Sequence, residues 1–185
     1  MMKTTEESIL PDTKKKRLIL FRHAKSDWRC DVRGDLERPL NQRGCQTACI
    51  MGRLLARSGQ IPDHILTSPA QRARQTIEYA IECGQWNRHP VVCDALYDAG
   101  ARDVLSCLRQ CSDRARTVLM TGHEPTFSQL IRILVGPIQL RYPTGALTRI
   151  DLDITQWCRC QAGCGELIWH LQPKFFTKGH FDLSN

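Results

Sequence analysis

The chain has 185 residues, of which 42% are hydrophobic and 24% charged, and its formal net charge is +7. A chain of this length and composition can bury one substantial core, so we predict a single domain over residues 17–185 after a disordered tail over residues 1–16. No apolar run approaches the roughly 18 residues of a membrane span, and the amino-terminal residues lack the apolar core of a signal peptide. These features predict a cytoplasmic protein with no membrane partner.

The excess of basic residues suits a phosphorylated or acidic partner. Apart from the run K-K-K-R at residues 14–17, however, these residues are scattered along the chain. We interpret that run as a solvated tail beside the first strand, because basic clusters interleaved with aromatic residues are absent. Nucleic acid is therefore not predicted as a partner, and the sequence leaves the oligomeric state open.

The first predicted strand, residues 17–22, is an apolar run that ends in Arg22 and His23. In parallel α/β sheets the chemistry gathers at such strand ends. A neutral imidazole can attack phosphorus, and a guanidinium can bind two phosphate oxygens at once. On this segment alone, an ordinary hydrogen-bonding role for His23 is the alternative interpretation.

The first helix is predicted to begin at Asn41, a favourable N-cap, and residues 64–67 form the second strand. Ser68 is predicted to cap the following helix through a capping box. Because this helix starts just beyond the carboxyl end of a strand, its first-turn amides and Arg72 are expected beside the site that His23 opens.

A third strand near residues 91–93 leads to Asp98 and another helix, and residues 117–121 form a buried strand that is followed closely by His123. The last two predicted strands lack a helix between them and pair as a hairpin around a cysteine-rich turn at residues 157–164. Repeated strand–helix units with a late hairpin predict an α/β fold, a three-layer α/β/α sandwich around a mostly parallel, mixed sheet.

Three strand ends therefore carry basic groups, namely Arg22 with His23, then Arg72, then His123. A phosphoryl group in transfer spreads negative charge over three equatorial oxygens, so fixed donors around it act mainly on the transition state. Such a pocket requires neither a metal nor a nucleotide, and the chain has no P-loop motif. We predict no cofactor and no metal.

Four of the ten cysteines stand at helical i, i+4 spacing: Cys45 with Cys49, and Cys107 with Cys111. They are interpreted as small buried apolar residues rather than as parts of a disulfide framework. Three more lie in the late turn with a spacing that misses the usual zinc pattern, so a metal there is the less favoured interpretation and the role of the turn stays open: Cys158, Cys160 and Cys164.

Four motifs follow one another along the chain: R-H-A-K-S-x-W at residues 22–28, R-P-L-N-Q-R-G at 38–44, L-T-S-P-A-Q-R-A-R-Q-T at 66–76 and V-L-M-T-G-H-E-P at 118–125. Together with Y-P-T-G-A-L at 142–147 and G-E-L-I-W at 165–169, they make the chain resemble the histidine phosphatase superfamily, with its phosphoglycerate-mutase-like fold. Within it, the chain is most similar to the SixA-like phosphohistidine phosphatases. The resemblance covers roughly residues 17–176 and implies the order of the strands in the sheet.

The resemblance implies that His23 is the nucleophile of a phosphohistidine intermediate and that Arg22, Arg72 and His123 hold the phosphate. Arg38 matches a further arginine of the short branch. From the residues alone, His123 could instead be a helix cap or a supporting group, and Arg38 could form a surface ion pair.

Asp98 matches the place of a general acid in longer family members, but it could equally cap the following helix. Members of the SixA-like branch lack a clearly assigned general acid at this position, which fits an imidazole leaving group. Because the chain lacks long insertions over the site, we expect an open pocket that admits phosphohistidine on another protein. A phosphatase of small phosphomonoesters and a non-catalytic phosphate-recognition module are the alternatives.

Overall fold

The computed structural model describes residues 15–177, and the predicted tail over residues 1–16 lies almost wholly outside them. The strands are β1 (Lys16–Arg22), β2 (His64–Thr67), β3 (Pro90–Val92), β4 (Thr117–Gly122), β5 (Leu147–Leu152) and β6 (Gly165–Leu171). The α-helices are α1 (Gln42–Arg57), α2 (Gln71–Gly84), α3 (Ala101–Arg109), α4 (Thr126–Val135) and α5 (Lys174–Thr177). Within this part of the chain, no helix is long and apolar enough to cross a bilayer.

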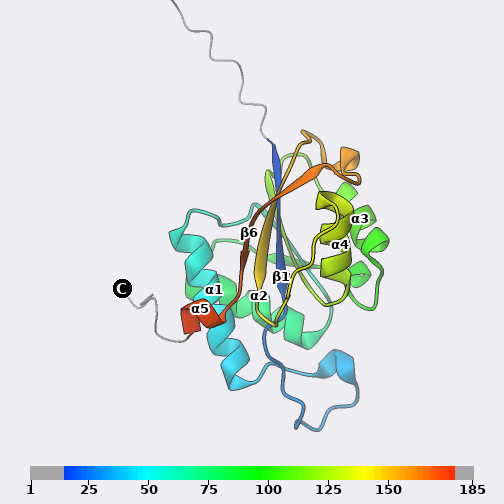
Figure 1. The fold of residues 1–185 in the computed structure, drawn as a ribbon. Helices are drawn as coiled ribbons and strands as arrows, with labels where there is room; N and C mark the ends of the chain where they lie inside the picture. Colours follow the sequence, from blue (N-terminus) through cyan, green and yellow to red (C-terminus); the bar gives the residue numbers. More distant parts are fainter. Residues whose placement is uncertain (1–14, 178–185) are drawn as a thin grey trace, which may run out of the picture.

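The sheet has the order β3-β2-β4-β1-β5-β6, and its first four strands are parallel. β5 runs antiparallel to both of its neighbours, so the sheet is mixed. Along β1 the side chains alternate between two cores. Leu18 and Leu20 pack with residues of α3 and α4, whereas Ile19 and Phe21 pack with residues of α1 and α2. The helices therefore cover both faces, as Figure 1 shows, and the predicted three-layer sandwich is confirmed.

The α1–α2 pair is packed with little space between the backbones. A Cβ atom built on Gly52 would lie 2.2 Å from the carbonyl oxygen of Ala80. The same closeness brings the Cα atoms of Cys49 and Cys83 to 5.0 Å, and these two residues form a disulfide. The prediction of a free, apolar Cys49 was therefore wrong, because its partner lies 34 residues away in sequence and is brought close only by helix packing.

The helix starts were predicted with mixed success. Asn41 is the N-cap of α1, and its side-chain Oδ1 accepts a hydrogen bond from Gly44 N–H at 2.9 Å, as expected. Ser68 is not a cap, because α2 begins only at Gln71 after the N-cap Ala70. Its hydroxyl accepts a hydrogen bond from Ala70 N–H at 3.3 Å and also contacts His123 in the site described below.

Lys16 departs from the prediction of a solvated basic run. Its side chain is buried, and its Nζ donates to the carbonyl oxygens of Asp113 at 2.7 Å and Ala115 at 3.0 Å. The ammonium also lies 5.6 Å from the ring centroid of Trp157. A lysine can be buried in this way because its charge is satisfied by carbonyl oxygens and an aromatic face at the start of β1.

The cysteine-rich turn joins β5 to β6, so the predicted hairpin is confirmed. In it, the sulfur atoms of Cys160 and Cys164 lie 3.9 Å apart. Among residues 15–177, no group of three or more His, Cys, Asp or Glu side chains is arranged to hold a metal ion.

Candidate active site

The site forms where three neighbouring parallel strands end. β4 lies between β2 and β1, and the register pairs Arg22 of β1 with Gly122 of β4. Backbone hydrogen bonds continue one residue beyond the strands, from His23 N–H to the Gly122 carbonyl and from Ser68 N–H to the Thr121 carbonyl, each 2.9 Å long. The residues that follow β1, β2 and β4 are thus held side by side at one edge of the sheet.

His23 is fixed in a single tautomer. Its Nδ1 lies 2.8 Å from the carbonyl oxygen of Ala24, which can only accept, so Nδ1 carries the proton and Nε2 keeps its lone pair. Burial first, and then the nearby His123 and Arg72, lower the pKa of His23 to about 3, although the hydrogen bond to Ala24 acts in the opposite direction. The imidazole is therefore neutral at physiological pH, as a nucleophile must be.

His123 lies beside it, with the two ring centroids 5.1 Å apart. The His123 Nε2 is 2.9 Å from the Ser68 hydroxyl, and its Nδ1 faces an Arg72 nitrogen at 3.5 Å. Because a guanidinium only donates, Nδ1 accepts and Nε2–H donates to Ser68. Burial first, and then the Arg72 charge, lowers the pKa of His123 to about 4. The cap interpretation of His123 is wrong, because the N-cap of α4 is Pro125.

Asp35 is a central residue that the sequence analysis missed. Its carboxylate accepts from Arg38 Nη2 at 2.6 Å and from Arg38 Nε at 3.0 Å, and it pairs with Arg72 Nη2 at 2.8 Å. Burial raises the pKa of Asp35, but the Arg38 hydrogen bonds and the Arg72 charge outweigh it, so the net shift is downward. The i, i+3 spacing of Asp35 and Arg38 was the available signal. The alternative of an ion pair for Arg38 is confirmed, but the Arg38 side chain is only 9% exposed, so the guanidinium is not at the surface.

The Arg38 guanidinium is held on three sides. Besides Asp35, it donates to the Ser26 hydroxyl and stacks on the Trp28 ring, with its central carbon 3.7 Å from the ring centroid. Arg22 is held at the floor of the site through a hydrogen bond to the Tyr142 carbonyl. These contacts fix two guanidinium groups before any ligand binds.

Two arginines keep an unsatisfied donor. The Nε atoms of Arg22 and Arg72 are buried and have no hydrogen-bond partner within the described ranges. Burial also lowers the pKa of Arg22 from its ordinary value. A buried donor without a partner carries a desolvation cost.

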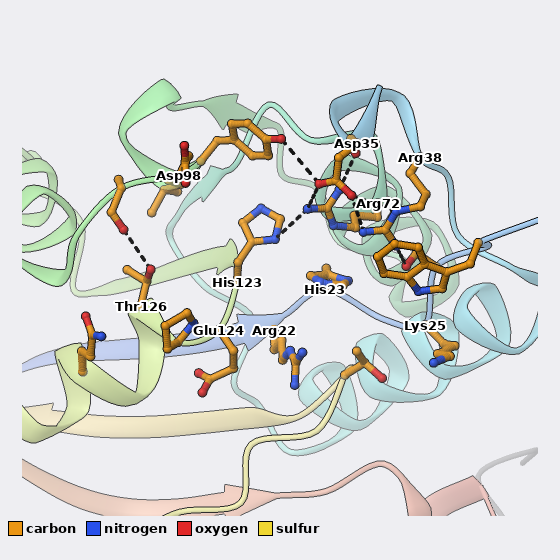
Figure 2. A pocket seen from close by; sticks show the side chains of 18 residues that line it. Arg22, His23, Lys25, Asp35, Arg38, Arg72, Asp98, His123, Glu124 and Thr126 are labelled. Carbon is orange, nitrogen blue, oxygen red and sulfur yellow. Dashed lines mark hydrogen bonds and ion pairs between the residues drawn. The ribbon is translucent and has the colours of Figure 1, made fainter. Parts of the chain in front are cut away.

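Asp98 lines the cavity but does not touch His23. Its backbone has φ +51°, a left-handed conformation that Asp tolerates better than most residues. The cap interpretation is wrong here also, because the N-cap of α3 is Gly100, whose N–H donates to the Asp103 carboxylate at 3.0 Å. In Figure 2 Asp98 lies at the far end of the cavity from His23.

A single cavity of about 730 Å³ brings all six predicted residues together, and it is open to solvent. They are Arg22, His23, Arg38, Arg72, Asp98 and His123. Figure 2 shows His123 beside Arg72, to which a dashed line joins it, and Asp35 in contact with the two arginines Arg38 and Arg72. The cavity thus gathers two imidazoles and three guanidiniums, groups that suit an anionic ligand.

The chain is similar to several known proteins. A family model described as the histidine phosphatase superfamily, branch 1, matches residues 18–100. An uncharacterized protein of Mycobacterium tuberculosis is 29% identical over 164 residues, which cover 83% of this chain and 100% of that protein. The phosphohistidine phosphatase SixA of Escherichia coli is 26% identical over 160 residues, which cover 85% of this chain and 94% of SixA.

A solved SixA structure from Agrobacterium tumefaciens has a TM-score of 0.73 and 28% sequence identity, and the match covers 85% of this chain and 98% of that one. The phosphoglycerate-mutase-like fold class is thereby confirmed. The chain is therefore similar to the histidine phosphatase superfamily and, within it, to the SixA proteins.

Proposed function

We propose that this protein is a phosphatase that works through a covalent phosphohistidine intermediate on His23 and that its substrate is phosphohistidine on another protein. The observation that carries the proposal is the state of His23, which is buried and neutral, with Nδ1–H bound to the Ala24 carbonyl. Its Nε2 lone pair is therefore available for attack on phosphorus.

In the first step, Nε2 of His23 forms a bond to phosphorus while the P–N bond of the substrate breaks. The departing imidazole takes a proton from solvent or from Asp98. Water then attacks the phosphorylated His23, the N–P bond breaks, and inorganic phosphate leaves. Both steps pass through a transition state whose equatorial oxygens carry negative charge.

The guanidiniums of the cavity supply the opposing charge in our proposal. Arg22 and Arg72 would contact the phosphoryl oxygens, and Arg38 would add a further guanidinium. His123 would contact the phosphoryl group by turning its Nε2–H from Ser68 to a phosphoryl oxygen. Donors that are already oriented cost no reorganisation when charge develops. The contacts of Arg38 with Asp35, Ser26 and Trp28 support such preorganisation.

Two observations favour a protein substrate. The cavity is open to solvent, so a phosphorylated side chain could enter it from another molecule. The E. coli relative is named as a phosphohistidine phosphatase. Small phosphomonoesters are the second candidate, because the same pocket would accept them with Asp98 as general acid.

The test is an intact-mass measurement on protein quenched during turnover of a small phosphoryl donor such as phosphoramidate. We expect an acid-labile adduct of one phosphoryl group in the wild type. His23→Ala should abolish both adduct and turnover, whereas His89→Ala, which changes an exposed histidine outside the cavity, should keep both. Turnover that survives in His23→Ala would refute the proposal. An oxyanion that binds without any adduct or turnover would indicate a recognition module instead.

A further inference from the structure

A second cavity, of about 270 Å³, adjoins the candidate active site. The two cavities share Lys25 and Thr144, which form the rim between them. We name the second cavity the basic groove and define it by its lining: Lys25, Arg43, Thr47, Arg141, Pro143, Thr144, Gln172, Pro173, Lys174 and Thr177.

The charged residues that line the basic groove are all positive. Four of its ten lining residues are cationic and none is Asp or Glu: Lys25, Arg43, Arg141 and Lys174. All four side chains are exposed, and in residues 15–177 none of them forms an ion pair. Like charges gathered in one groove repel one another, and an anionic ligand would relieve that repulsion.

The groove is built from well-packed segments that lie far apart in sequence. Gly145, at φ +79°, brings the 141–146 segment so close to α1 and Pro173 that a Cβ there would lie 2.7 Å from Thr47. The Arg141 carbonyl accepts from the Gln172 side chain at 3.3 Å and lies 3.0 Å from His170 Nε2. The backbones that carry these cations are therefore held in place without a ligand.

We propose that the basic groove binds acidic side chains that flank the phosphorylated residue on the partner protein. The proposal rests on the proposed function, since it assigns the substrate of that same site. A phosphoryl group bound at His23 would leave the neighbouring residues of its chain to cross the rim at Lys25 and Thr144 into the groove. There the carboxylates of Asp or Glu would meet the four cations.

The nature of the groove favours an acidic protein segment over other anions. In a site for a small dianion, the cationic side chains would be buried and would point toward one position. The four cationic side chains of the groove are long and exposed instead. Single-stranded nucleic acid binds by stacking its bases on aromatic rings, and the groove has no aromatic lining residue. Exposed lysines and arginines spread over a groove suit several carboxylates of one segment.

The test compares two histidine-phosphorylated peptides, prepared with phosphoramidate, that differ only in flanking Glu or Gln residues. The wild type should show a kcat/KM about tenfold higher for the Glu peptide at low salt, and 0.5 M NaCl should remove most of this preference. In Arg43→Glu/Arg141→Glu the ratio of the two values should fall to about one. The control Arg114→Glu/Arg159→Glu changes two exposed arginines outside both cavities and should keep the ratio.

Equal kcat/KM values for the two peptides in the wild type, or an unchanged ratio in Arg43→Glu/Arg141→Glu, would overturn the proposal. Fluorescence anisotropy with the unphosphorylated Glu peptide tests the groove without turnover. It should report binding that Arg43→Glu/Arg141→Glu loses. A single-stranded RNA that displaces this peptide at lower concentration than the peptide itself would refute the choice of partner. Absence of turnover and of an adduct with phosphoramidate would instead refute the proposed function, while the binding assay would still decide the groove.

Discussion

Asp35 shows how much of this site depends on one residue that makes no contact with His23. Its carboxylate joins Arg38 and Arg72, two buried guanidiniums that come from different elements. The Tyr97 hydroxyl also reaches the carboxylate, at 3.5 Å. We interpret Asp35 as a positioning residue that acts through the arginines.

Asp35→Asn should lower kcat/KM for phosphoramidate about tenfold, because a neutral amide holds two guanidiniums less firmly than a carboxylate does. The matched control is Glu37→Gln, an exposed residue in the same short helix that does not line the cavity. Steady-state kinetics with both variants makes the comparison. If Asp35→Asn lowered KM and left kcat unchanged, the carboxylate would be a competitor of the phosphate rather than a support for its ligands.

Asp98 separates the two candidate substrate classes. Imidazole is a better leaving group than an alkoxide, so phosphohistidine hydrolysis depends less on a general acid. Asp98→Asn should therefore reduce hydrolysis of an alkyl phosphate about a hundredfold and of a phosphohistidine peptide less than tenfold. The measurement is kcat for both substrates in both proteins. An equal loss on the two substrates would show that Asp98 does not act as an acid.

At the scale of elements, the packing of α1 against α2 positions two arginines of the site. Arg38 lies in the loop before α1, and Arg72 lies in the first turn of α2. Gly52 of α1 lies so close to the Ala80 carbonyl of α2 that a hydrogen atom fits between them but a methyl group does not. The contact is with backbone atoms, which cannot turn away as a flexible side chain can.

Gly52→Ala should lower the free energy of unfolding by about 1–3 kcal/mol, because the new methyl group must push α1 and α2 apart. Gly34→Ala is the matched control: it has open space around it and extended backbone, and should change stability by no more than about 0.5 kcal/mol. Urea unfolding of the three proteins measures the difference. A Gly52→Ala protein as stable as the wild type would mean that the helices are free to separate.

For the whole molecule, the buried histidines link stability to pH. The folded-state pKa of His23 is about 3, below the ordinary value of about 6.5 for an unfolded chain. The unfolded state therefore binds the proton more tightly, and the stabilisation is complete above pH 6.5 and is lost as the pH falls toward 3.

On acidification from pH 7 to pH 5, this one group should cost the wild type about 2 kcal/mol of unfolding free energy. His23→Asn removes the titrating group, so its loss over the same interval should be smaller by about that amount. His89→Asn, which replaces an exposed histidine, should follow the wild type. Urea unfolding at the two pH values measures these changes. Equal losses in His23→Asn and the wild type would mean that His23 does not titrate below its ordinary range.

The sequence by itself determined the layers of the fold and the convergence of Arg22, His23, Arg72 and His123 on one edge. Both follow from local rules, because hydrophobic periodicity sets each element and the carboxyl ends of adjacent parallel strands must meet. The order of the strands came from the resemblance to a family rather than from periodicity.

Only the tertiary structure decided what depends on contacts between distant segments. It shows that Ser68 is a partner of His123 rather than a helix cap and that Cys49 forms a disulfide with Cys83. It also shows that Lys16 is buried and that Asp35 lies between two arginines. Each of these changes depends on contacts between residues that lie from 34 to 99 positions apart in sequence, with the Asp35–Arg72 contact spanning 37. Local propensity does not report such distances, since they arise only when whole elements pack.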